Sequence, residues 1–126
     1  MALAQLSFFS HTLRRGVGAN VILPQENPPA CGKTRKTLYL LHGLSDDHTM
    51  WSRRTSIERY AEEYGIYVVM PDGGRGWYTD ACHGEKFYTF MTEELPAIMR
   101  SFFAGMSERR EDNYIAGLFM GGVGAL

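Results

Sequence analysis

Short apolar runs alternate with segments of helical periodicity along the whole chain of 126 residues. The runs that predict strands are Gln5–His11, Ala19–Leu23, Leu38–Leu41, Tyr67–Met70 and Tyr114–Ala116. The first two are joined by a glycine-containing segment, Arg15-Gly16-Val17-Gly18, and predict an amino-terminal hairpin. The later runs are continuously apolar, as strands covered on both faces are. Strands that alternate with helices favour an α/β fold around a parallel sheet.

Two segments have apolar residues spaced by three or four, which is typical of helices. The first, Thr49–Tyr64, is followed by Gly65, which suits a left-handed helix cap. The second, Phe87–Phe103, contains Pro96, which indicates a first turn or a kink at that position. The stretch between the two, Asp72–Glu85, is predicted to be a long irregular segment after the fourth strand.

The last strand leads into a glycine-rich motif that suggests chemistry. Residues 113–124 read Asn-Tyr-Ile-Ala-Gly-Leu-Phe-Met-Gly-Gly-Val-Gly, so an apolar run enters Gly117 and another glycine follows at Gly121. This is the spacing of the G-x-S-x-G nucleophile elbow, where small residues are needed because a strand turns sharply into a helix. The residue at the tip should carry a hydroxyl or thiol that a nearby base activates. Here the tip is Phe119, so the motif has the frame of a hydrolase site without its nucleophile.

Other glycine-rich turns have to be weighed against this interpretation. Strand-to-helix turns of this kind also bind phosphates, and an ordinary tight turn is the simplest alternative. The glycines between 117 and 124 do not follow G-x-G-x-x-G, and the chain has no Gly-Lys-Ser or Gly-Lys-Thr. The sequence therefore disfavours a nucleotide-binding site.

A second motif upstream favours a hydrolase over an ordinary turn. The apolar run Thr37–Leu41 leads directly into His42-Gly43-Leu44. In α/β-hydrolases an H-G turn after the third strand donates one backbone N–H to the oxyanion hole, and the residue after the nucleophile donates the other. The corresponding donors here are the N–H groups of Leu44 and Met120. Backbone donors need no particular side chain, so Phe119 does not remove them.

The chain resembles the esterase D-like branch of the α/β-hydrolases, most closely the bacterial tributyrin esterases and more distantly the S-formylglutathione hydrolases. The segments that carry the resemblance are Val21–Pro24, Leu40–Asp47, Trp51, Val68–Gly73, Trp77–Asp80, Glu93–Pro96 and Ile115–Gly117. Family members usually read G-L-S-M-G-G at the elbow, so Phe119 replaces the expected serine. The resemblance implies an α/β-hydrolase fold in which the elbow strand is the fifth of eight. Residues 1–126 are then expected to be the amino-terminal part of a single domain, truncated after the elbow with about five of its strands.

The resemblance also implies an activity and predicts its absence from this chain. The family hydrolyses small-molecule esters with short acyl groups through an acyl-enzyme and needs no cofactor. The triad order is nucleophile, acid, histidine, and neither an acid nor a histidine follows Phe119 in this sequence. The 126-residue chain is therefore expected to be inactive. One alternative is a non-catalytic ligand- or protein-binding α/β-hydrolase remnant; another is a carbohydrate esterase or acyltransferase of the same superfamily.

Three aromatic residues are candidates for the substrate cleft. Trp51 either lines the acyl pocket or packs the first helix against the core. Trp77 and Tyr78 lie in the long irregular segment and either border the cleft or are ordinary core or surface aromatics.

Other candidate groups point to no further site. His48 beside Asp46 and Asp47 raises the question of a metal site, but one histidine with adjacent carboxylates is more typical of a solvated loop, and no metal is expected. His42 is expected to pack the H-G turn. Cys82 has a thiol, but nothing in the sequence places a base beside it.

Composition and charge limit the partners. An apolar fraction of 44% with 13% aromatic residues is that of a globular domain. A net charge of −1 without a basic stripe gives no reason to expect a nucleic acid. No apolar run approaches the roughly 18 residues of a membrane span, and no signal peptide is evident, so we expect a cytoplasmic protein without a membrane partner. An apolar last strand at a sheet edge would favour homo-oligomers or aggregation.

Overall fold

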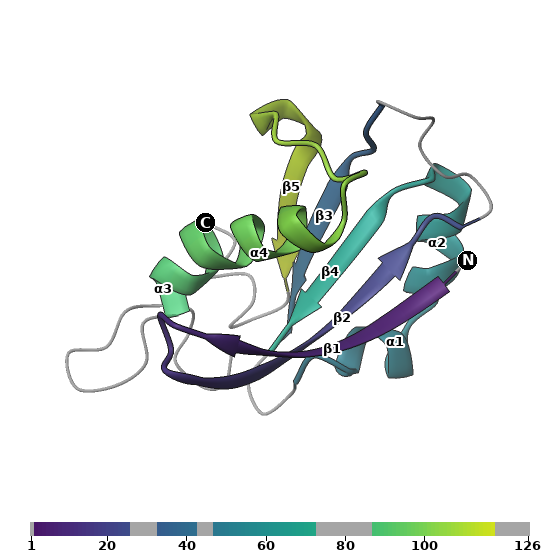
Figure 1. Ribbon diagram of the computed structural model, residues 1–126. Helices are drawn as coiled ribbons and strands as arrows, with labels where there is room; N and C mark the ends of the chain where they lie inside the picture. Colours follow the sequence, from purple (N-terminus) through teal and green to yellow (C-terminus); the bar gives the residue numbers. More distant parts are fainter. Residues whose placement is uncertain (1, 26–32, 43–46, 73–86, 118–126) are drawn as a thin grey trace.

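The computed structural model describes residues 2–25, 33–42, 47–72 and 87–117 (Figure 1). Five strands form one mixed sheet in the order β1-β2-β4-β3-β5. The strands are β1 (Ala2–Ser10), β2 (Arg15–Leu23), β3 (Thr37–Leu41), β4 (Tyr67–Pro71) and β5 (Asn113–Gly117). The pairs β1–β2 and β2–β4 are antiparallel, whereas β3 is parallel to both β4 and β5. The α/β fold with a parallel sheet core is therefore confirmed, as are the five strands.

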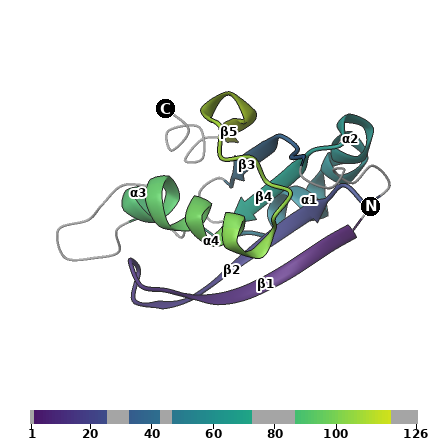
Figure 2. The same ribbon diagram turned by 45° about the horizontal axis from the view of Figure 1, so that its top comes forward.

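Helices cover the two faces of this sheet (Figure 2). One face carries α1 (Met50–Arg54) and α2 (Ile57–Tyr64), and the other carries α3 (Phe87–Thr89), η1 (Phe90–Glu94) and α4 (Leu95–Phe102). A short 3-10 turn, η2 (Arg110–Asp112), leads into β5.

Alternate residues of β4 belong to two separate cores, because successive side chains of a strand point to opposite faces. Val68 and Met70 pack with Ala61 of α2, whereas Tyr67 and Val69 pack with Met99 of α4 and its neighbours. All five residues of β4 are buried. The continuously apolar sequence of this strand follows from its position between two helical layers.

The amino-terminal hairpin is present, but its turn lies earlier than the sequence predicts. Arg15-Gly16-Val17-Gly18 belongs to β2, and the turn occupies residues 11–14, where Arg14 has φ = 58°. The hairpin register therefore runs from Ala2 opposite Leu23 to Ser10 opposite Arg15. The expectation based on the glycines was wrong because a distant side chain holds this turn.

That side chain is Glu94, on the π-helical turn η1. Its carboxylate accepts hydrogen bonds from the hydroxyl of Ser10, from the N–H of His11 at 2.9 Å and from the N–H of Thr12 at 3.2 Å. The Ser10 hydroxyl oxygen in turn accepts the N–H of Leu13 at 3.0 Å. One carboxylate thus satisfies donors that the turn itself leaves without backbone partners.

The first predicted helix is divided into α1 and α2. Thr55 between them is extended, with φ = −138° and ψ = 171°. Its hydroxyl donates to the carbonyl of Trp51 at 2.5 Å and accepts the N–H of Ile57 at 3.2 Å. Threonine hydroxyls can replace backbone groups in the hydrogen bonds of a helix. Here the Thr55 hydroxyl binds the last turn of α1 and the first residue of α2, so that the two helices are separate. Gly65 has φ = 63° and ψ = 42°, so the predicted left-handed cap is confirmed.

The second predicted helix is continuous but changes its winding before Pro96. The N–H of Leu95 donates to the carbonyl of Phe90, five residues earlier, so η1 is π-helical. Pro96 lies in the first turn of α4 and has no N–H for the carbonyl of Thr92, four residues earlier. A wider turn before the proline accommodates this missing donor. The prediction of a first turn or kink at Pro96 is confirmed.

We predict that Glu94→Ala lowers the free energy of unfolding of the chain by about 1–3 kcal/mol, because it leaves several donors of the hairpin turn unsatisfied. Denaturant unfolding followed by circular dichroism measures this change. Glu93→Ala is the matched control, since Glu93 is exposed on the same turn. Equal destabilisation by both substitutions would contradict the role assigned to Glu94.

Candidate active site

The two sequence motifs leave the sheet from paired strand ends. Leu41, the last residue of β3, lies opposite Gly117, the last residue of β5. His42 of the H-G turn follows the first strand end, and the glycine motif begins at the second. Because the strands are parallel, both motifs emerge at the same edge of the sheet, which is where α/β proteins bind their ligands.

Several predicted site residues lie outside the described residues. They are the nucleophile position Phe119, the oxyanion donors Leu44 and Met120, and the cleft candidates Trp77 and Tyr78. Their roles stay predictions. The strand ends from which their segments depart are described.

His42 is fully enclosed at the carboxyl end of β3. Its side chain is 1% exposed, and its Nε2 lies 3.5 Å from Oδ1 of Asp72, directly after β4. The backbone N–H of Asp72 donates to the carbonyl of Gly18 in β2 at 3.1 Å, which fixes the position of the carboxylate. The imidazole therefore links the ends of two neighbouring strands and orients the first residue of the H-G turn. This agrees with the expected packing role.

Sequence reasoning missed the partner of His42, although a signal for it was present. Asp72 directly follows the buried strand β4, just as His42 directly follows β3. Adjacent parallel strands bring residues in this position together at one edge. The order of the strands in the sheet, which the sequence does not state, was needed to choose this pair.

Trp51 lies on α1 and is held to the sheet at the same edge. Its indole N–H donates to the carbonyl of Leu41 at 3.1 Å, and its ring packs against the core on the α1 and α2 face. The residue thus has the helix-packing role that was one of its two alternatives. The indole is anchored to the strand end that precedes the H-G turn. A second role of Trp51, in lining an acyl pocket, stays a proposal.

The segment before α1 is organised by Asp47. Its Oδ1 accepts the hydroxyl of Thr49 at 2.6 Å and the N–H of Thr49 at 2.8 Å. These two hydrogen bonds, first the hydroxyl and then the backbone N–H, lower the pKa of the Asp47 carboxyl. Asp47 therefore fixes the start of the helix that carries Trp51.

His48 packs on β2 rather than facing solvent. Its ring lies so close to Gly18 that a Cβ at that position would be 3.0 Å from the imidazole Cε1. The absence of a side chain at Gly18 makes room for the ring. Within the described ranges, no three His, Cys, Asp or Glu residues are grouped so that they could hold a metal ion.

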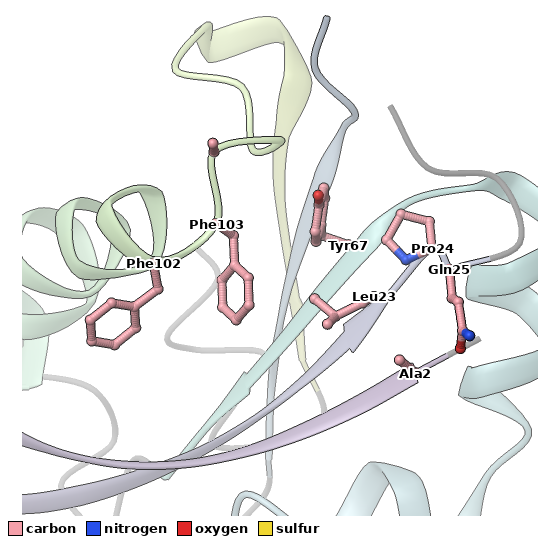
Figure 3. A pocket seen from close by; sticks show the side chains of 8 residues that line it. Ala2, Leu23, Pro24, Gln25, Tyr67, Phe102 and Phe103 are labelled. Carbon is pink, nitrogen blue, oxygen red and sulfur yellow. The ribbon is translucent and has the colours of Figure 1, made fainter. Parts of the chain in front are cut away.

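An apolar pocket of about 480 Å³ lies elsewhere on the molecule (Figure 3). It is lined by Ala2, Leu23, Pro24, Gln25, Tyr67, Phe102, Phe103 and Ala104. Tyr67 is the first residue of β4, so the pocket lies at the amino end of that strand, whereas the two motifs lie at the carboxyl ends of parallel strands. It is therefore separate from the candidate active site.

Comparisons with known proteins identify the family and the fold. A protein-family profile described as "Putative esterase" matches residues 10–126. The acetyl esterase of Caldicellulosiruptor saccharolyticus is 32% identical over 133 residues, which cover 100% of this chain and 50% of that protein. The substrate-bound fluorophosphonate-binding serine hydrolase F of Staphylococcus aureus is 38% identical, with a TM-score of 0.87 over 96% of this chain and 48% of its own. The S-formylglutathione hydrolase FrmB of the same organism is also 38% identical, with a TM-score of 0.81 over 97% of this chain and 50% of its own.

The mixed sheet with helices on its faces and the likeness to the two solved hydrolases define the α/β-hydrolase class. The chain belongs to the esterase family within that class, as its sequence resemblance indicates. It spans about half the length of the acetyl esterase and of both solved structures. None of the helices in the described part of the chain has the length and apolar character needed to cross a membrane.

We predict that Asp47→Asn destabilises the chain at neutral pH and that the difference disappears in acid. The folded pKa of Asp47 is depressed, so its charge contributes stability above the unfolded value of about 3.9, and this contribution is lost as the pH falls through the folded pKa. The side chain is 48% exposed, so solvent screening limits the effect to less than about 1 kcal/mol.

Urea unfolding of both proteins between pH 7 and pH 2.5 measures this dependence. Glu62→Gln on the exposed surface of α2 controls for the loss of one negative charge. A destabilisation by Asp47→Asn that is constant down to pH 2.5 would contradict a contribution from the charge of Asp47.

Proposed function

We propose that this chain contributes part of the active site of a carboxylic ester hydrolase that acts on short-chain acyl esters. We also propose that Phe119 leaves the 126-residue chain without esterase activity. The observation that supports this best is the register that places Leu41 opposite Gly117. It brings the start of the H-G turn and the start of the glycine elbow to adjacent strand ends. Such an arrangement suits an oxyanion hole formed by backbone N–H groups from both segments.

The proposed chemistry assigns a role to each segment. In an active homologue, a serine at the position of Phe119 attacks the ester carbonyl, and the N–H groups of Leu44 and Met120 stabilise the oxyanion. The alcohol leaves with a proton from the general acid, and water then releases the acyl group as a carboxylic acid. Phenylalanine has no atom that can form the acyl-enzyme, so the first step does not occur in this chain.

The preference for small acyl groups is supported by the relatives and by the position of Trp51. One relative is named for acetyl groups and another for S-formylglutathione. Trp51 is fixed to the Leu41 carbonyl, next to the H-G turn, where an indole ring would narrow an acyl pocket. His42 and Asp72 act as positioning residues, because their contact orients the turn without placing either side chain at the reacting carbonyl.

The replacement at Phe119 also favours a second candidate function, that of a non-catalytic binding module. An aromatic side chain in place of the nucleophile would fill the reacting position and add apolar contact area for a ligand or a partner protein. Retention of ester or acid binding without turnover would distinguish this candidate from a catalyst.

We predict that the purified 126-residue chain does not hydrolyse p-nitrophenyl butyrate above background and that Phe119→Ser alone does not change this result. No acid or histidine follows residue 119 in this chain, so the serine would have neither a general base nor an orienting carboxylate. The measurement is release of p-nitrophenol, with a serine-directed fluorophosphonate as inhibitor.

The matched positive variant is Phe119→Ser in this chain fused to the carboxy-terminal half of the acetyl esterase. We expect inhibitor-sensitive turnover from this fusion and none from the same fusion with Phe119→Ala. Robust turnover by the single substitution in the unfused chain would show that one of the four histidines present acts as the base.

A further inference from the structure

Strand β1 lies at one edge of the sheet and lacks the features that normally protect an edge. Within the described sheet, β2 is the sole strand paired with β1, so one row of N–H and C=O groups of β1 faces outward (Figure 1). The strand has nine residues and contains neither a charged residue nor a proline. Its register with β2 runs one to one from Ala2 to Ser10, without a bulge. Natural sheets use short strands, charges, prolines or bulges to keep an open edge from pairing with another chain.

The exposed side chains of β1 form a single row on one face of the sheet. Leu3 is 40% exposed and Phe9 is 56% exposed, and Gln5 and Ser7 between them are exposed as well. Successive side chains of a strand alternate between faces, so the other row of β1 packs against the core on the α4 face; its members there are Ala4, Leu6 and Phe8. The exposed row is therefore apolar at its two ends and polar in its middle.

This row is complementary to a second copy of itself. A two-fold axis pairs a strand with its own copy in the antiparallel direction. When the axis passes beside Leu6, the middle residue of β1, all nine residues find an opposite residue. Leu3 then lies opposite the partner's Phe9, and Gln5 lies opposite the partner's Ser7. Residues directly opposite each other share a face, so apolar meets apolar and polar meets polar, each pair occurring twice.

Other registers of the same pairing lack this match. A shift by one residue would place the exposed row of one copy opposite the core-facing row of the other. A shift by two residues would place Leu3 or Phe9 opposite a polar residue and would leave the other of the two beyond the paired strands. The register centred on Leu6 is thus specified by the side chains of β1.

The core-facing row fits the same register. Ala4 lies opposite the partner's Phe8, so a small side chain meets a large one, and Leu6 lies opposite its own copy. The ring of Phe8 meets that of Phe102 edge-on, with 6.4 Å between centroids, and Phe102 of α4 is 53% exposed. A partner strand beside Phe8 would therefore bury apolar surface on this face as well as on the outer one.

We propose that β1 is a homodimer interface, in which two copies of this chain pair β1 with β1 about a two-fold axis at Leu6 and join their sheets into one continuous sheet. This pairing uses the free edge of β1 in both copies, so the assembly closes at two chains. Pairing of β1 with β5 of another copy would be head-to-tail and would continue into filaments.

The proposal goes beyond the proposed function, because it concerns association of the chain rather than ester chemistry. Strands β2 and β4 lie between β1 and β3, so pairing at β1 leaves the carboxyl ends of β3 and β5 accessible. Neither Phe119 nor the glycine motif takes part in it. A failure of the dimer and a failure of the esterase assignment therefore give different results.

The first experiment measures the mass and the edge protection of the unsubstituted 126-residue chain. Sedimentation equilibrium over micromolar concentrations is expected to show a monomer–dimer equilibrium without larger species. Hydrogen exchange is measured at a low and a high concentration of the same range. The amides of residues 3–9 that face outward are expected to exchange more slowly at the high concentration, because pairing supplies their acceptors. This measurement needs no variant.

Charge substitutions test the register. Leu3→Lys and Phe9→Glu each place a charge opposite an apolar residue, and each is expected to raise the Kd of the dimer at least about 10-fold. In the double variant Leu3→Lys/Phe9→Glu, the introduced lysine lies opposite the partner's introduced glutamate. We expect this variant to dimerise at least about 3-fold more tightly than either single variant, with a gain that decreases as salt is added.

Three further variants are the controls. Leu3→Lys/Phe9→Lys has two substitutions at the same positions but places like charges opposite each other, so no recovery is expected. Tyr64→Lys changes a side chain of α2 that is 72% exposed, and Ile115→Lys changes the opposite edge strand β5. Both are expected to leave the Kd of the dimer unchanged. Circular dichroism establishes that each variant keeps the fold.

Three outcomes would overturn the proposal. In the first, the unsubstituted chain stays monomeric, with exchange at residues 3–9 independent of concentration. In the second, it forms species larger than a dimer, or Ile115→Lys dissociates it while Leu3→Lys does not, which would assign the association to β5. In the third, the oppositely charged double variant dimerises no more tightly than the like-charged one.

Discussion

The parallel pairing of β3 with β5 is the constraint on which the candidate site depends. The two strands are separated by more than 70 residues of sequence, yet their last residues, Leu41 and Gly117, lie opposite each other. A shift of this register by one residue would turn the side chains of β5 to the wrong faces and move the glycine motif relative to the H-G turn. The pairing of β3 with β4 brings His42 and Asp72 into contact. The indole of Trp51 binds the carbonyl of Leu41 at the same edge of the sheet. The site is thus set by backbone pairing first and by side-chain contacts second.

Local pattern was enough to predict the elements, but long-range contacts decided their boundaries. The apolar runs of β3 and β4 are largely buried strands, and the run of β5, which is more exposed, is apolar as well, so composition alone identifies all three. The position of the hairpin turn was missed because Glu94, a residue far along the chain, binds it. The break at Thr55 was missed because the Thr55 hydroxyl competes with the backbone hydrogen bonds of the helix. Such a competition does not change the spacing of apolar residues from which the helix was predicted. The motifs identified the strand ends of the site, whereas Asp72 required the order of strands in space.

Under the proposed function, Phe119 separates two properties that are usually joined in an esterase, the fold of the site and its reactivity. The features that fold the site are strand pairing, buried apolar residues and small glycines, and none of them depends on the identity of the nucleophile. The features that perform the reaction are a few side chains, and replacing one of them changes the chemistry without affecting the pairing of the strands. On this proposal, family membership and catalytic competence depend on different residues of the chain.

The contact of Glu94 with the hairpin turn has a consequence for the order in which the chain acquires structure. Ser10 and Glu94 are 84 residues apart, so a ribosome that adds about 5–20 residues per second delivers the carboxylate about 4–17 s after the turn it binds. Throughout that interval the turn between β1 and β2 lacks its acceptor. Closing a loop of this length also carries an entropic cost that local contacts do not. The turn of the first hairpin therefore gains its acceptor only after most of the chain has been synthesised.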